Sequence, residues 1–264
     1  MLALTQVFYI SISNASQDRL KLILFLDKST SMEDELQVLA DLSEQITEKL
    51  SNRCSEYSIA VSELEYGDIQ SDPVGLIGFP AFITEEHPNP AEALKERILS
   101  NLPTQDCSSR ESCISRSAAH VGTKEFTYSS VVTTFQRNRN QIFNEPIRHL
   151  SAFIVTDAAP LAEPYSVDQA VEHIGSFIPL NKFSATTLSH ENWNDIRGSC
   201  TLDLPDRISY TNNDLKRLNR FAHYTHGFAF NICESRSPNM KVLLEQQIDD
   251  FLNDIIMRGC LLVS

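Results

Sequence analysis

The sequence predicts an α/β protein with a doubly wound, mainly parallel central sheet flanked by helices. Two strongly apolar segments, residues 20–27 and 150–157, each end in an aspartate, and such runs are typical of strands buried on both faces. Strand-like and helix-like segments alternate along the chain, which is the pattern of a parallel sheet with crossover helices. A hydrophobic content of 42% in 264 residues is sufficient for a substantial core.

The first third of the chain predicts two extended segments and a helix. Residues 5–13 favour a short strand or an extended arm, and residues 20–27 the first buried strand. A helix is predicted over 33–50, because apolar residues recur on one helical face. They are Leu36, Leu39, Leu42 (or Ser43 in its place), Ile46 and Leu50.

Two strands, a helix and a loop are predicted next. In residues 57–62, Tyr57, Ile59 and Val61 alternate with smaller residues, which is the period of a strand. Residues 74–79 predict another strand, closed by Pro80. Residues 90–102 predict a helix that begins with a proline, where proline is tolerated, and residues 103–122 predict a loop.

The second half continues the alternation. Helices are predicted over 128–142, 167–177 and 214–224, and strands over 150–157, 181–188 and 227–233, with a long polar stretch at 190–213. A last helix, 240–257, carries one apolar stripe, with Gly259 suited to its C-terminal end. The stripe is Leu244, Ile248, Phe251, Leu252 and Ile255. We therefore expect a single domain over 1–264 with a short N-terminal extension, residues 1–18.

Charge and hydropathy exclude some classes of protein. The formal net charge is −13, which argues against binding to nucleic acid, because phosphates demand a basic surface. No apolar run is long enough for a transmembrane helix. Residues 1–4 lack the basic start and long apolar centre of a signal peptide. We expect either a cytoplasmic chain or one whose targeting segment has been removed.

Six cysteines favour the second alternative. Cys107 and Cys113 lie in one polar segment, and a disulfide between them would staple the loop near 103–122. An even count with such a pair favours an oxidising compartment, so we expect an exported protein. The alternative is six reduced, mostly buried thiols.

The most informative motif follows the first buried strand. Asp27, Ser29 and Ser31 lie on the turn at its carboxyl end, and open α/β sheets bind ligands in the crevice there. One carboxylate and two hydroxyls make a hard, oxygen-only pocket, which suits Mg²⁺ or another hard divalent ion.

The Asp-x-Ser-x-Ser pattern resembles the metal-ion-dependent adhesion site of von Willebrand factor type A domains, most closely those of exported bacterial adhesin-like proteins. The resemblance implies that Asp157 ends a strand adjacent to the first one and joins the site. It also implies a threonine ligand before the helix that precedes that strand. Thr127 is the better candidate and Thr123 the competing one. The expected cofactor is Mg²⁺, or Mn²⁺ or Ca²⁺.

The resemblance also bears on the other cysteines. It implies a Cys200–Cys233 disulfide, which leaves Cys54 and Cys260 at one end of the fold, either bonded or free. The chain departs from the family pattern at Thr30, where a small residue is usual, and at Ala158-Ala159-Pro160 after the second acid. Neither departure removes a ligand atom.

The expected function is divalent-cation-dependent adhesion or ligand binding. Three hydroxyls and two carboxylates, of which one or both act through water, only partly neutralise the ion, so an acidic group of a protein or other partner can replace a bound water. We expect no enzyme, because no general base lies with a nucleophile. One alternative is a structural or interaction subunit of a cell-envelope assembly that does not use a metal. A minor one is a metal-dependent phosphohydrolase.

Overall fold

The computed structural model describes residues 19–28, 32–66, 75–100, 125–156, 163–189, 212–231 and 240–260. They contain a six-stranded sheet with the order β4-β2-β1-β6-β7-β8. All strands of this sheet are parallel to one another except β4, which pairs antiparallel with β2 at one edge. The strands are β1 (Arg19–Leu26), β2 (Tyr57–Glu63), β4 (Ile83–Thr84), β6 (Ile147–Val155), β7 (Phe183–Ser189) and β8 (Ala229–Asn231). The predicted doubly wound, mainly parallel sheet is confirmed.

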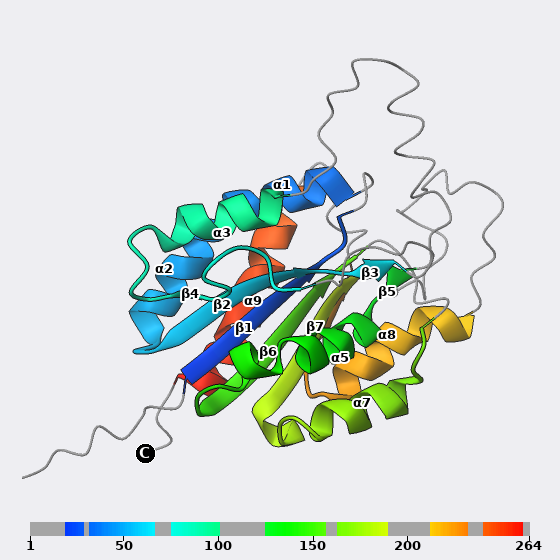
Figure 1. Ribbon diagram of the computed structural model, residues 1–264. Helices are drawn as coiled ribbons and strands as arrows, with labels where there is room; N and C mark the ends of the chain where they lie inside the picture. Colours follow the sequence, from blue (N-terminus) through cyan, green and yellow to red (C-terminus); the bar gives the residue numbers. More distant parts are fainter. Residues whose placement is uncertain are drawn as a thin grey trace, which may run out of the picture.

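Helices cover both faces of the sheet (Figure 1). One layer contains α1 (Glu33–Asp41), α2 (Ser43–Arg53), α3 (Pro90–Leu99) and α9 (Met240–Gly259). The other contains α5 (Tyr128–Arg137), α6 (Arg139–Ile142), α7 (Val167–Gly175) and α8 (Asn212–Tyr224), and the short 3₁₀ helix η2 (Leu180–Lys182) leads into β7.

The alternation of side chains along β1 explains the two layers. Leu22 and Leu24 face the first layer, whereas Ile23 and Phe25 face the second. Because successive side chains of a strand point to opposite faces, the part of a central strand that is covered by helices on both sides is apolar at successive positions, as it is from Leu22 to Leu26. The continuous run in β1 is therefore the consequence of two cores on one sheet.

The predicted strand at 74–79 is wrong for its described part, residues 75–79. Leu76 makes a single antiparallel bridge to Ser62, and the edge strand is β4 instead. Gly78 adopts a φ of +85°, which is outside the extended region. Pro80 then lacks the N–H that a strand would donate.

Two predicted helices are interrupted. The helix expected over 33–50 breaks at Leu42, and the one expected over 128–142 breaks at Asn138. Leu42 is buried and its N–H still bonds the Val38 carbonyl at 3.1 Å. The break at Leu42 is thus a bend that keeps both apolar faces on the sheet.

A disulfide joins Cys54, which follows α2, to Cys260, which follows α9. The sequence analysis left open whether these two cysteines are bonded or free, and in the structure they are bonded. Within the described ranges there is no free cysteine. The predicted Cys107–Cys113 and Cys200–Cys233 pairs lie outside the described residues, as do the extension 1–18 and the loop 103–122.

Candidate functional site

The candidate site lies where the strand order reverses. From β1 the chain adds β2 on one side, and β6, β7 and β8 on the other. The carboxyl ends of β1 and β6 are adjacent and in register, with Leu26 opposite Val155. Ligands of open α/β sheets bind at this type of switch point. The residues that follow Leu26 and Val155 are therefore candidates for function.

Asp27 is the first of these residues. Its side chain is fully buried, its N–H donates to the Val155 carbonyl at 2.9 Å, and its Oδ2 accepts a hydrogen bond from Thr156 Oγ1 at 3.1 Å. Burying a carboxylate is costly unless it gains polar or cationic partners. The bond to Thr156 fixes the carboxylate at the junction of β1 and β6.

Thr127 reaches the same edge by a different route. It directly follows β5 (Glu125–Phe126), which pairs antiparallel with β3 (Glu65–Tyr66). Strand β3 comes just after β2, and Leu64 between them donates its N–H to the Leu26 carbonyl at 3.0 Å. Figure 1 shows this two-stranded ribbon beyond the carboxyl ends of β1 and β2. The ribbon thus carries Thr127 to the edge where Asp27 lies.

Glu163 is a site residue that the sequence analysis missed. Its Oε1 accepts hydrogen bonds from the N–H and Oγ1 of Thr127, both at 2.5 Å, and its Oε2 accepts from the N–H of Ser129 at 3.0 Å. Burial raises the pKa of the Glu163 carboxyl, and these hydrogen bonds oppose the rise. The carboxylate caps the first turn of α5, where helix N–H groups lack partners.

The hydrogen bonds of Glu163 hold the Thr127 side chain in place. A hydroxyl that ligates a metal uses a lone pair, so its proton needs an acceptor elsewhere. Glu163 is that acceptor for Thr127. The sequence offered one signal, an acid six residues after Asp157, but nothing in the spacing showed that it would turn back to Thr127.

Lys28 was also missed. Its side chain is buried, and its Nζ donates to the carbonyls of Arg97, Ile98 and Ser100, at 3.1 Å and 2.7 Å for the first two. Burial lowers the pKa of Lys28 to about 8. A cation at a helix C-terminus satisfies the last carbonyls. Lys28 therefore ties the chain just after Asp27 to the end of α3.

Two of the five predicted ligands lie in the described part of the chain. Asp27 and Thr127 are both fully buried at the carboxyl edge. Ser29, Ser31 and Asp157, together with the competing Thr123, lie outside the described residues. No group of three or more His, Cys, Asp or Glu side chains in the described ranges could hold a metal. The two placed donors, a carboxylate and a hydroxyl with its proton accepted by Glu163, fit a hard cation such as Mg²⁺.

Comparison with known proteins gives structural likenesses only. No family profile and no curated protein sequence matches the chain. Among solved structures, a von Willebrand factor type A protein from Catenulispora acidiphila is similar, with 13% identity, a TM-score of 0.44, and coverage of 91% of this chain and 42% of that one.

Two further solved structures are similar. Proximal thread matrix protein 1 from the mussel byssus has 12% identity, a TM-score of 0.49, and coverage of 89% and 48% of the two chains. The pilus adhesin SpaC from Lactobacillus rhamnosus GG has 8% identity, a TM-score of 0.49, and coverage of 92% and 31%. This chain spans less than half the length of each of the three. With such low identities and TM-scores, functional assignment depends on this chain's own residues.

Proposed function

We propose that this chain is a ligand-binding module of the von Willebrand factor type A kind, which binds an acidic group of a protein or other partner through Mg²⁺ or a similar divalent cation. The cation would be held by Asp27, Ser29, Ser31, Thr127 and Asp157. The activity would be recognition, without catalysis.

One observation carries the proposal. The Asp27 carboxylate is fully buried at the junction of β1 and β6 and is held there by Thr156, the residue just before Asp157. A carboxylate in the crevice at the switch point of a parallel sheet is well placed for a bound cation. The hydrogen bonding of Thr127 to Glu163 supports the same conclusion, because it fixes a hydroxyl at this edge.

The chemistry of such a site favours binding. Hydroxyl ligands are neutral, and a carboxylate that acts through a water would neutralise the ion only partly, so the ion could still attract a negatively charged ligand. Mg²⁺ usually retains several waters in protein sites, and an incoming carboxylate can replace one of them. When bound, the cation would supply the electrostatic attraction for the partner, while the protein supplies the fixed oxygens.

We also propose that the protein is exported. The Cys54–Cys260 disulfide supports this, because disulfides persist in oxidising compartments and are rare in the cytosol. No helix in the described ranges is long and apolar enough to cross a membrane.

The test is titration of the metal-free protein with Mn²⁺ and with Mg²⁺ by calorimetry, together with melting curves. Binding should raise the melting temperature, because a ligand of the native state stabilises that state. Asp27→Asn should remove both the heat of binding and the rise in melting temperature.

Asp250→Asn is the matched control, because it makes the same chemical change at an exposed position on α9. This variant should titrate like the wild type. If the wild type binds neither cation, or if Asp27→Asn binds as well as the wild type, the proposed site is wrong. The metal-independent interaction subunit then becomes the better hypothesis.

A further inference from the structure

A cleft lies near the amino ends of β1 and β2, away from Asp27 and Thr127. Its volume is about 480 Å³, and it opens between residues 75–84 and residues 138–145, with Arg19 and Ser58 also lining it. Cavities of roughly 300–1,000 Å³ are the usual size of small-molecule sites. The cleft shares no residue with the candidate metal site.

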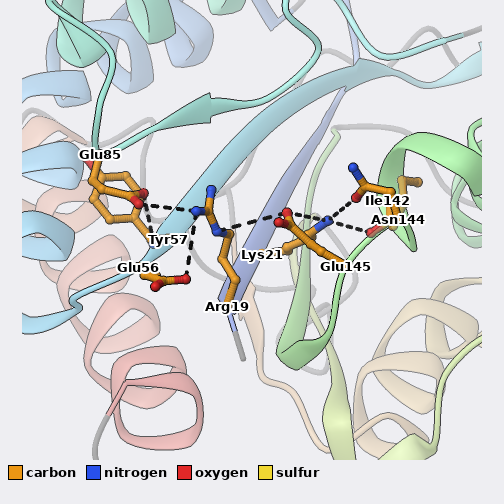
Figure 2. Close-up of polar contacts among 8 residues, drawn as sticks. All are labelled: Arg19, Lys21, Glu56, Tyr57, Glu85, Ile142, Asn144 and Glu145. Carbon is orange, nitrogen blue, oxygen red and sulfur yellow. Dashed lines mark hydrogen bonds and ion pairs between the residues drawn. The ribbon is translucent and has the colours of Figure 1, made fainter. Parts of the chain in front are cut away.

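One wall of the cleft is polar and is fixed by an ion-pair network (Figure 2). Lys21 Nζ lies 3.2 Å from Glu145 Oε1 and donates to Asn144 Oδ1 at 3.1 Å. Arg19 lies 3.3 Å from Glu85 and 4.0 Å from Glu145. Because the Lys21 side chain is only 1% exposed, this network holds Asn144 and Glu145 in place at the cleft. Their orientation is thus set before any ligand arrives, which lowers the entropic cost of binding.

The opposite wall displays an aromatic ring. Phe79 is 100% exposed, yet its neighbours are held firmly. The buried Arg97 donates from Nη1 to the Ala81 carbonyl at 2.7 Å and from Nη2 to the Pro80 carbonyl at 2.6 Å. Gly78 packs so closely that a Cβ there would lie 2.8 Å from Arg97 Nε. Exposing an aromatic ring to water is unfavourable, and the Phe79 ring does not contribute to the core. Exposed aromatic side chains of this kind commonly serve as contact residues for a ligand or partner.

One residue that lines the cleft, Ser58, carries a buried hydroxyl without a partner. Ser58 is 1% exposed, and its Oγ has no hydrogen-bond partner. Buried polar atoms usually have a partner, so each exception calls for an explanation. Nearer the surface, Asn140 and Gln141 add two exposed carboxamides to the lining. Each carboxamide offers both donors and an acceptor.

We propose that this cleft binds a neutral sugar residue of a glycan. A sugar presents hydroxyls that donate and accept, which the carboxamides and Glu145 can match, and an apolar C–H face that Phe79 can cover. The charges favour a neutral ligand. Three carboxylates, those of Glu56, Glu85 and Glu145, surround two cations, Arg19 and Lys21, so an acidic sugar would be repelled.

The test is a glycan array probed with the labelled protein, followed by NMR titration of the ¹⁵N-labelled protein with the neutral glycans that bind. We expect neutral glycans to bind and to shift the side-chain amide signals of Asn140, Gln141 and Asn144. Phe79→Ala should weaken binding by about tenfold, the equivalent of roughly 1.4 kcal/mol of aromatic contact. Asn140→Ala should also weaken it. Both positions are exposed, so the fold should be unaffected.

Met257→Ala is the control, since it removes another exposed apolar side chain, on α9. This variant should bind glycans normally, and EDTA should change nothing, because the cleft is independent of the proposed metal. A blank array, glycan binding that survives Phe79→Ala at full strength, or a preference for sialylated or sulfated glycans would overturn the proposal. Shifts of the cleft amides that depend on protein concentration alone would show instead that a second copy of the chain occupies the cleft.

Discussion

The hydroxyl of Thr127 donates a 2.5 Å hydrogen bond to the carboxylate of Glu163, 36 residues further along the chain. The same carboxylate accepts the N–H groups of Thr127 and Ser129. A candidate metal ligand and the first turn of α5 are therefore held by one acidic side chain. If Thr127 ligates a cation, its hydrogen bond to Glu163 contributes to the affinity for that cation.

Replacing Glu163 should weaken cation binding without direct loss of a proposed ligand. We expect Glu163→Ala to lower the affinity for Mn²⁺ by about tenfold, the lower end of the effect typical of residues that orient metal ligands. Glu163→Gln keeps one acceptor oxygen and should have an intermediate effect. Calorimetric titration measures both. Glu172→Ala, an exposed acid on α7, is the control and should bind normally. Equal affinities for Glu163→Ala and the wild type would contradict the positioning role.

Replacing Lys28 should destabilise the fold through the end of α3. Lys28→Met keeps most of the unbranched side chain but leaves the carbonyls of Arg97, Ile98 and Ser100 without this donor. We expect the free energy of unfolding to fall by about 1–3 kcal/mol, the range for an unsatisfied buried polar group. Urea denaturation measures the change.

Lys95→Met is the comparison, because Lys95 lies on α3, the helix whose end Lys28 caps. Lys95 forms a surface ion pair with Asp41, in which both side chains are more than a third exposed. Its loss should cost less than about 1 kcal/mol. If the two variants lose the same stability, the capping role of Lys28 is not supported.

The Cys54–Cys260 disulfide should contribute strongly to stability. The two cysteines are 206 residues apart in sequence, and cross-linking distant residues restricts the unfolded chain. We expect the double variant Cys54→Ala/Cys260→Ala to lose about 2–5 kcal/mol, measured by urea denaturation under oxidising conditions. An unchanged denaturation midpoint would show that the bridge does not form in the purified protein.

Acid should destabilise the protein through His149. Its ring lies buried in β6, with Nε2 2.8 Å from Ser184 Oγ, and burial, together with the charge of Arg258, lowers its pKa to about 4. An unfolded histidine has a pKa of about 6.5. Between these values the unfolded chain binds a proton that the folded chain does not, so stability falls as the pH falls from 6.5 to 4.

The full effect of His149 amounts to about 3 kcal/mol, since each pKa unit corresponds to about 1.4 kcal/mol. His149→Gln should lack this part of the acid sensitivity. Urea denaturation of both proteins at pH 7, 5 and 4 gives the difference. A stability difference between them that stays constant with pH would contradict the lowered pKa.

The fold was largely predictable from local patterns. The strands β1 and β6 each end in a mainly apolar segment that marked them in the sequence, and the helical stripes gave α7, α8 and α9 within a few residues. Prediction failed where local geometry overrode hydrophobicity. Residues 75–79 look like a strand by composition, but Gly78 with a positive φ and the following Pro80 turn the chain away.

The sequence by itself determined which residues could make a hard cation site, because Asp27 and the hydroxyls after it follow a strand whose composition requires burial. Only the tertiary structure decided what supports that site. Glu163 and Lys28 act on partners 36 and about 70 residues away, and the cleft beside Phe79 joins segments about 60 residues apart. Hydrophobic periodicity is a local signal that reports burial. Hydrogen bonds between distant segments depend on how the elements pack, and no spacing along the chain encodes them.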